Sequence, residues 1–112
     1  MKLEVGMYVR LDTGKIGKII YFKERDSYPY SYDRITIDSE RYTRTTRNVI
    51  KASNNIIDLI EVGDIVVIIN GMRKKELMLI KNLDKEIHIL NTHKIVSIVT
   101  KEQFESMSYK VN

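Results

Sequence analysis

The sequence predicts an all-β chain of two small tandem β-barrels followed by a short C-terminal helix. One observation is a short repeat: residues 4–9 read Glu-Val-Gly-Met-Tyr-Val, and residues 61–66 read Glu-Val-Gly-Asp-Ile-Val. A glycine that permits a tight turn, followed by alternating apolar residues, is typical of the opening of a small β-barrel. The other observation is a series of short apolar runs separated by turn signals about every 8–12 residues, which is an all-β pattern.

The boundary between the two barrels is expected at Ser-Asn-Asn, residues 53–55, a cluster of turn-forming residues. We therefore predict an N-terminal domain at residues 1–55 and a C-terminal domain at residues 56–112. In the first, alternation indicates strands near residues 5–11, 16–22, 33–38 and 41–47, and a short apolar run at 49–52. Gly17 lies inside the second of these strands and predicts a bend or bulge there.

The second domain is expected to open with a single helical turn at residues 56–60. Strands are expected at 65–70, 76–81, 86–90 and 94–99, with Asn-Gly at 70–71 forming the first hairpin turn. A helix is then expected at residues 100–107, because Thr100 and Gln103 have the spacing of a capping box. Phe104 and Met107 fall on one side of this helix, so we expect them to be buried against the domain.

Charge and aromatic residues are concentrated in the first half of the chain. The formal net charge is +4, and residues 1–56 hold 11 Lys/Arg against 7 Asp/Glu, whereas residues 57–112 hold 8 of each. Six of the seven arginines and six of the seven tyrosines also lie in the first half. Because arginine and tyrosine are enriched at binding hot spots, the first half is predicted to carry the contact surface.

Two stretches supply the candidate binding residues. The expected 41–47 strand alternates arginine, tyrosine and threonine, which suits phosphate contacts or, equally, a charged edge strand protected from aggregation. The long polar loop at 23–32 holds the sequence Tyr-Pro-Tyr-Ser-Tyr, whose rings could stack on bases or anchor in a protein pocket. The predicted partner-binding residues are Arg25, Tyr28, Tyr30, Tyr32, Arg34, Arg41, Tyr42, Arg44 and Arg47.

Catalytic and metal sites are not predicted. The chain has no cysteine, which leaves no thiol nucleophile, no disulfide and no thiolate zinc site. No serine lies in a nucleophile elbow and no glycine-rich phosphate loop is present. His88 and His93 are read as ordinary solvated or hydrogen-bonded side chains. We therefore expect a non-enzymatic protein without a cofactor.

The opening residues resemble a known family of small barrels. Val5-Gly6-Met7-Tyr8-Val9-Arg10, followed by Gly14-Lys15-Ile16-Gly17-Lys18-Ile19-Ile20, resembles SH3-like barrels of the KOW and Tudor type. Residues 62–66, Val-Gly-Asp-Ile-Val, keep the first half of this signature without the later glycine pair. The resemblance implies two SH3-like barrels, a fold that binds RNA, DNA, peptides or protein surfaces.

A second resemblance concerns whole proteins. Residues 1–10, 56–64 and 98–107 look like stretches of small uncharacterised phage and prophage proteins of clostridia and related Gram-positive bacteria. It implies an inhibitor of host defence, similar in role to anti-CRISPR proteins, that binds a host protein or nucleoprotein complex in the cytoplasm of the bacterial host. A direct nucleic-acid-binding module and a phage structural or assembly protein remain alternatives. The longest apolar run, residues 65–69, is far shorter than a membrane span, so no membrane partner is expected.

Overall fold

A computed structural model describes residues 2–25 and 32–107 of the chain. Contacts within the chain divide it into two compact units, unit 1 (residues 1–59) and unit 2 (residues 60–112), which are described separately. The fold is mostly β, with two sheets and two short α-helices. No helix in the described residues has the length and apolar character that a bilayer crossing requires.

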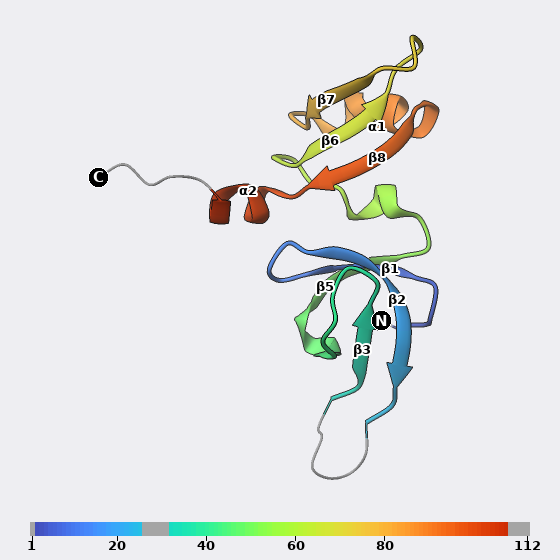
Figure 1. The fold of residues 1–112 in the computed structure, drawn as a ribbon, viewed down its shortest axis with the longest axis vertical. Coiled ribbons are helices and arrows are strands. Elements are labelled where there is room, and N and C mark those ends of the chain that lie inside the picture. The colour runs from blue at the N-terminus through green and yellow to red at the C-terminus, as the bar shows by residue number, and fades with distance from the viewer. Residues whose placement is uncertain (1, 26–31, 108–112) are drawn as a thin grey trace, which may run out of the picture. The chain divides into compact units, whose positions relative to one another are not determined.

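Unit 1 is a curved five-stranded sheet with the strand order β4-β3-β2-β1-β5 and antiparallel neighbours (Figure 1). Two 3₁₀ helices, η1 and η2, flank the last strand. The bounds are β1 Tyr8–Leu11, β2 Ile16–Lys23, β3 Arg34–Ile37, β4 Arg44–Thr45, η1 Thr46–Asn48, β5 Val49–Ser53 and η2 Ile56–Leu59.

β2 is the strand that lets this sheet curve. Its first half pairs with β1 and its second half with β3, and the register to β3 shifts between Ile19 and Tyr21. Gly17 is required before this bend, since a Cβ there would lie 2.7 Å from Ser39 Oγ and 2.9 Å from the Ile37 side chain. β2 thus carries an irregularity as predicted, but it lies between Ile19 and Tyr21 and not at Gly17, which pairs regularly with Val9. The shift places the end of β2 beside β3.

The core of unit 1 follows from alternation along its strands. Val9 and Leu11 of β1, Ile19 of β2 and Ile35 and Ile37 of β3 are all fully buried. Residues two apart in a strand share a face, and the pairing of Ile19 with Ile37 joins β2 to β3, so these side chains lie on one face of the sheet. Full burial of an aliphatic side chain of this size contributes roughly 1.5–3 kcal/mol.

Unit 2 is a three-stranded antiparallel sheet with the order β7-β6-β8 (Figure 1). Helix α1 lies on one face of this sheet, where Val66 and Ile68 of the central strand and Leu90 of the helix are buried. The bounds are β6 Ile65–Ile69, β7 Lys75–Leu79, α1 Leu83–Thr92, β8 Lys94–Val99 and α2 Lys101–Met107.

The repeated Glu-Val-Gly segments adopt the same hydrogen-bonded turn. Gly6 has φ +97° and Gly63 has φ +98°, a left-handed conformation that glycine takes without strain. The Gly6 N–H donates to the Ile19 carbonyl, and the Gly63 N–H donates to the Ile80 carbonyl, both at 2.9 Å. The following residue in each turn donates to the carbonyl of Glu4 or Glu61. The repeat predicted from six residues is therefore a structural repeat.

The two units share a three-strand plan built on this turn. In unit 1 the strand after the turn is β1, which lies between β2 and β5; in unit 2 it is β6, which lies between β7 and β8. Unit 1 then inserts β3, β4 and η1 before its last strand, whereas unit 2 inserts α1. In residues 2–25 and 32–107 the strands form open sheets, so the predicted closed barrels are not present in that part of the chain.

The expected strand at residues 86–90 is wrong, because this segment belongs to α1. Asn82 caps the helix by accepting a hydrogen bond from the Lys85 N–H. The Glu86 carboxylate accepts from the N–H groups of Lys81 (2.8 Å) and Asn82 (2.6 Å). These bonds satisfy backbone donors that a helix start leaves without partners, so they favour the helix over an isolated strand.

Glu86 gives the first testable prediction. The hydrogen bonds from Asn82 and Lys81 hold the pKa of Glu86 below its ordinary value of 4.5. Because the folded-state pKa lies below the unfolded one, the stabilisation is present above the unfolded pKa and is lost as pH falls through the folded one. Glu86→Gln should therefore lower the urea midpoint of unit 2 at neutral pH, and the difference from wild type should vanish in acid.

Urea titrations monitored by circular dichroism, from neutral pH down to about pH 2, measure this difference. Glu76→Gln, in the exposed strand β7, is the matched control for loss of one carboxylate. A gap between Glu86→Gln and wild type that persists unchanged in acid would contradict the capping role.

The expected strand at residues 41–47 is also wrong in extent. Only Arg44 and Thr45 form β4, and the chain then turns into η1. The Arg44 side chain donates two hydrogen bonds to the Glu40 carboxylate, at 2.9 and 3.0 Å. The Thr45 hydroxyl donates to Asn48 Oδ1 at 2.9 Å. These local bonds favour a turn on each side of β4 over a longer strand.

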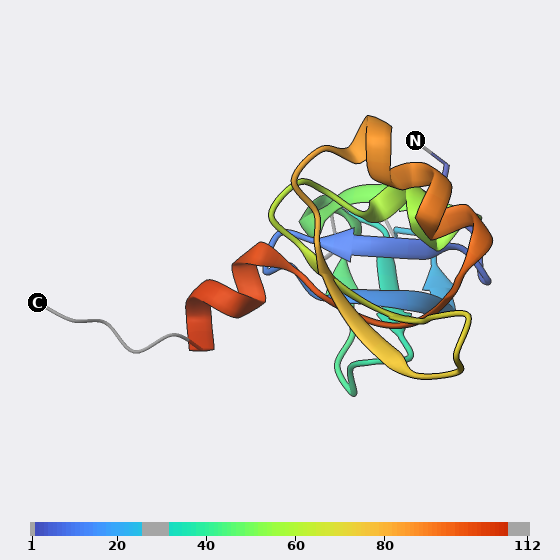
Figure 2. The ribbon, with the colours of Figure 1, turned by 90° about the horizontal axis from the view of Figure 1, so that it is seen from above.

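The C-terminal helix is confirmed, but its packing is not. Gln103 Oε1 accepts from the Thr100 N–H, and Thr100 Oγ1 accepts from the Gln103 N–H, as a capping box requires. Phe104 and Met107, however, are 57% and 82% exposed, so their predicted burial is wrong. Helix α2 projects away from the sheet of its unit in both views (Figure 1 and Figure 2). Lys101 in its first turn holds the helix to the rest of the unit, because its N–H donates to Asp64 Oδ1 and its Nζ donates to Glu61 Oε1.

Candidate binding surface

A hollow opens at one end of the unit 1 sheet, where four segments distant in sequence come together. The hollow encloses about 410 Å³. The N-terminal segment contributes one side, the end of β2 another, and the segment that enters β3 and the start of η1 complete it. The lining residues are Lys2, Leu3, Phe22, Glu24, Asp33 and Thr46.

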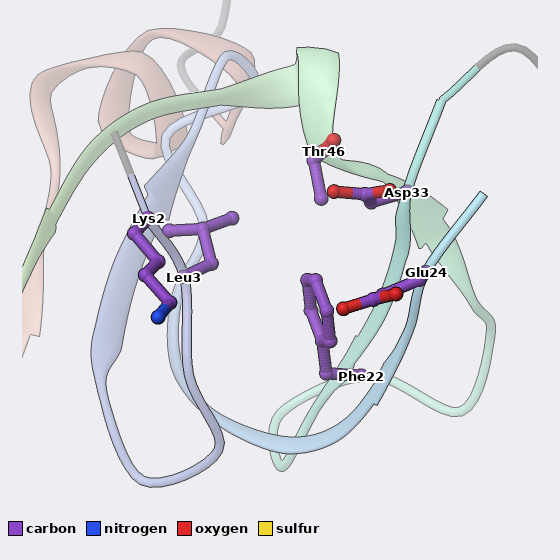
Figure 3. A pocket seen from close by; sticks show the side chains of 6 residues that line it. All are labelled: Lys2, Leu3, Phe22, Glu24, Asp33 and Thr46. Carbon is purple, nitrogen blue, oxygen red and sulfur yellow. The ribbon is translucent and has the colours of Figure 1, made fainter.

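The hollow combines an apolar floor with two carboxylates. Figure 3 shows Leu3 and Phe22 facing each other across it, with the carboxylates of Glu24 and Asp33 directed into the same space. Leu3 and Phe22 are also packed against the buried core of unit 1. The floor is therefore the exposed margin of the core, and the acidic groups lie on its rim.

A second, smaller hollow adjoins the first and shares two of its residues. It encloses about 240 Å³ and is lined by Arg25, Tyr32, Asp33 and Thr46. Asp33 fixes the wall between the two hollows: its Oδ1 accepts from the Arg25 N–H, and its carbonyl accepts from the Thr46 N–H, both at 2.8 Å. The segment after β2 and the start of η1 are thereby tied to the residue that precedes β3.

Arg47 stacks on Tyr32 beside this second hollow. The guanidinium carbon lies 5.2 Å from the centre of the tyrosine ring, within the range of a cation–π contact. Both side chains are exposed. A cationic group held over an aromatic ring loses less freedom on binding a partner than a free arginine would, so this pair suits a contact surface.

The structure brings together three of the predicted binding residues. Arg25 and Tyr32 line the second hollow, and Arg47 joins them through the Tyr32 ring. We call Arg25, Tyr32 and Arg47 the arginine–tyrosine cluster. The sequence suggested them by residue type alone, and the register of β3 with β4, in which Arg34 pairs with Thr45, explains why Tyr32 and Arg47 meet.

The other predicted residues of this half lie elsewhere or are otherwise engaged. Arg41 and Tyr42 are exposed near the turn that joins β3 to β4, which is at the other end of these strands. Arg44 forms a two-bond ion pair with Glu40, which raises the pKa of the Arg44 guanidinium above its ordinary value. Arg34 is half-buried within β3, and its Nε is shielded from solvent.

Tyr28 and Tyr30 fall outside the described residues, so their predicted role stays a prediction. Sequence reasoning missed Leu3, Phe22 and Asp33, which shape the hollows. Phe22 was visible as the last apolar position of the second strand. The convergence of the N-terminal segment on it depends on the curvature of β2 and has no local signal.

The described residues contain no group of three or more His, Cys, Asp or Glu side chains arranged to hold a metal ion. Comparisons with protein-family models, with curated proteins and with solved structures gave no match for this chain. The resemblances to KOW and Tudor barrels and to phage proteins therefore stay predictions.

Proposed function

We propose that this chain is a non-enzymatic binding protein whose unit 1 contacts a partner through the arginine–tyrosine cluster and the two hollows. The observation that carries the proposal is the exposed Arg47–Tyr32 stack beside those hollows. It offers an aromatic anchor, an ordered cation and an apolar floor at one place. Interface hot spots are enriched in these residue types and tend to surround a recess.

The mixed charge of the surface favours a protein as the partner. Glu24 and Asp33 direct carboxylates into the larger hollow, next to Arg25 and Arg47. Carboxylates repel phosphate groups, and tight binding to nucleic acid usually relies on a continuous basic face. A protein surface can match both signs, which gives specificity and orientation.

We also propose a biological role for the chain and a relation of its two units to a known fold. The resemblance to small phage proteins supports a role as an inhibitor of a host defence protein or nucleoprotein complex, acting in the cytoplasm of the bacterial host. The shared opening turn and three-strand plan support a relation of both units to SH3-like folds. A direct nucleic-acid-binding role is the competing reading, because Tyr32 and Arg47 could stack on bases.

Capture from a lysate of a defence-competent Gram-positive host, with and without nuclease, tests the proposal. We expect the full chain to retain the same host protein after nuclease treatment, because the contact is to protein. Retention should fall when Tyr32 or Arg47 is replaced by alanine. Moderate salt should change the association rate more than the dissociation rate.

The matched controls are Tyr42→Ala and Arg41→Ala, which remove the same side-chain types from exposed positions outside the cluster. Both should retain the host protein as wild type does. Loss of all captured protein after nuclease, with binding that declines steeply and linearly in log salt, would assign the surface to nucleic acid instead.

A further inference from the structure

The outer edge of β7 has open backbone hydrogen-bonding groups. In the described sheet, β7 pairs with β6 on one side and with no strand on the other. The Asn70 N–H donates to the Lys74 carbonyl, and the Ile80 N–H donates to the Asp64 carbonyl, both at 2.9 Å. Because bonded pairs alternate in an antiparallel ladder, the even-numbered residues of β7 bond to β6. Lys75, Leu77 and Leu79 therefore direct their N–H and carbonyl groups outward.

Two of these residues, Leu77 and Leu79, present an apolar row on one face. Leu77 is 71% exposed and Leu79 is 49% exposed. They pair with Val67 and Ile65 of β6, so they lie on the face opposite the buried Val66 and Ile68. Natural proteins usually cover or block such an edge, because open backbone groups beside apolar side chains invite another strand. No proline or bulge interrupts β7, and the charge on this edge is carried by Lys75, which an opposing carboxylate would neutralise.

The charge along this edge identifies the kind of strand that would fit. Arg73, Lys74 and Lys75 are exposed at the start of β7, and Lys81 is exposed just after its end. A second copy fits poorly. If two copies pair antiparallel with Leu77 opposite Leu77, Lys75 lies opposite Leu79 of the other copy. If Leu77 lies opposite Leu79, Lys75 lies opposite Lys81. In neither register does Lys75 face a carboxylate. An acidic side chain opposite Lys75 would supply the missing complement.

We propose that β7 is a strand-addition site for an extended segment of a partner protein, which pairs antiparallel to β7. Read from its N-terminus, the segment has an apolar residue opposite Leu79, another opposite Leu77 and an acidic residue opposite Lys75. Main-chain hydrogen bonds to three residues supply affinity, and the alternate side chains supply selectivity. This surface is separate from the arginine–tyrosine cluster and does not depend on the function proposed for it.

A capped synthetic peptide tests the site on the full chain. Every second residue of the peptide is threonine. The residues between the threonines are, in order, valine, valine and glutamate, to lie opposite Leu79, Leu77 and Lys75. The control peptide has lysine in place of the glutamate. Amide hydrogen exchange and chemical shifts are recorded for the labelled chain. We expect slowed exchange at Leu77 and Leu79, and binding about threefold to tenfold weaker for the lysine peptide.

Leu77→Pro is the decisive variant, because its lost N–H points outward and the ladder to β6 keeps its bonds. It should abolish peptide binding while the Val66 amide stays protected. Leu77→Thr, which keeps the N–H and the strand preference, should weaken binding by a smaller factor and serves if the proline variant does not fold. Three results would overturn the proposal: equal binding of both peptides, unchanged binding by either variant, or self-association of the chain through β7 that excludes the peptide.

Discussion

Asp64→Ala is expected to lower the free energy of unfolding of unit 2 by about 3–5 kcal/mol, on the basis of two charged hydrogen bonds lost together. Asp64 is fully buried. Its Oδ2 accepts from the Glu61 N–H at 2.8 Å, and its Oδ1 accepts from the Lys101 N–H at 3.0 Å. One carboxylate thus closes the opening turn and holds the first residue of α2, whose helix dipole also favours a negative charge there.

The loss is large because alanine leaves two backbone donors without their acceptor in a partly buried site. Asp64→Asn should fall between alanine and wild type, because an amide can accept one of the two bonds but not both. Hydrogen exchange at Val66 and Ile68 reports the stability of the unit 2 core, and exchange at Phe104 reports α2. Unchanged protection at all three amides in Asp64→Ala would show that the carboxylate is not a clamp.

Arg10→Ala is expected to lower the free energy of unfolding of unit 1 by about 3–5 kcal/mol. Arg10 lies in β1, between its partners Ile16 of β2 and Lys51 of β5, and is fully buried. Its Nη1 donates to the Leu59 carbonyl at 3.0 Å, at the end of η2. The substitution therefore removes a charge-assisted bond and leaves both a cavity and a buried carbonyl without its donor.

Arg10→Met separates the two contributions. Methionine fills much of the space but donates no hydrogen bond, so it should cost less than alanine, because a buried charge also carries a desolvation penalty. Arg47→Ala is the matched control, and its stability should stay within about 1 kcal/mol of wild type, since Arg47 is exposed. For each of the three variants, the free energy of unfolding is measured by denaturant titration, and amide hydrogen exchange at Val9 reports the stability of the unit 1 core. A loss for Arg47→Ala as large as that for Arg10→Ala would contradict the assignment.

These residues also show which parts of the fold local sequence could reveal. The opening turns were predictable because a glycine before alternating apolar residues is typical of a tight turn that leads into a strand. Both glycines indeed take positive φ. Asp64 stood in the repeat as the counterpart of Met7, but its bond to Lys101 joins residues far apart in the chain. The hydrogen bond between Arg10 and the Leu59 carbonyl likewise joins residues far apart in the chain. A pattern within a strand does not identify such long-range partners.

The error at α1 has a different cause. Ile87, Ile89 and Leu90 around a histidine gave an apparent strand, although Leu83, Ile87 and Leu90 also have helical spacing. Capping by Asn82 and Glu86 decides between the two. In the binding surface, residue type suggested Arg25, Tyr32 and Arg47. The acidic and apolar residues beside them gather only because β2 curves, which a linear reading does not contain.

The most direct test of the proposed binding surface is a comparison of two tyrosines. The dissociation constant of the captured host protein is measured for wild type, Tyr32→Ala and Tyr42→Ala, with Val9 exchange as the check on folding. Tyr32 is part of the cluster, whereas Tyr42 is the more exposed ring, at 76%, and lies outside it. We predict that Tyr32→Ala weakens binding by about 30-fold or more, equivalent to about 2 kcal/mol, while Tyr42→Ala changes it less than about threefold. Equal losses for the two variants, or a larger loss for Tyr42→Ala, would contradict the proposed surface.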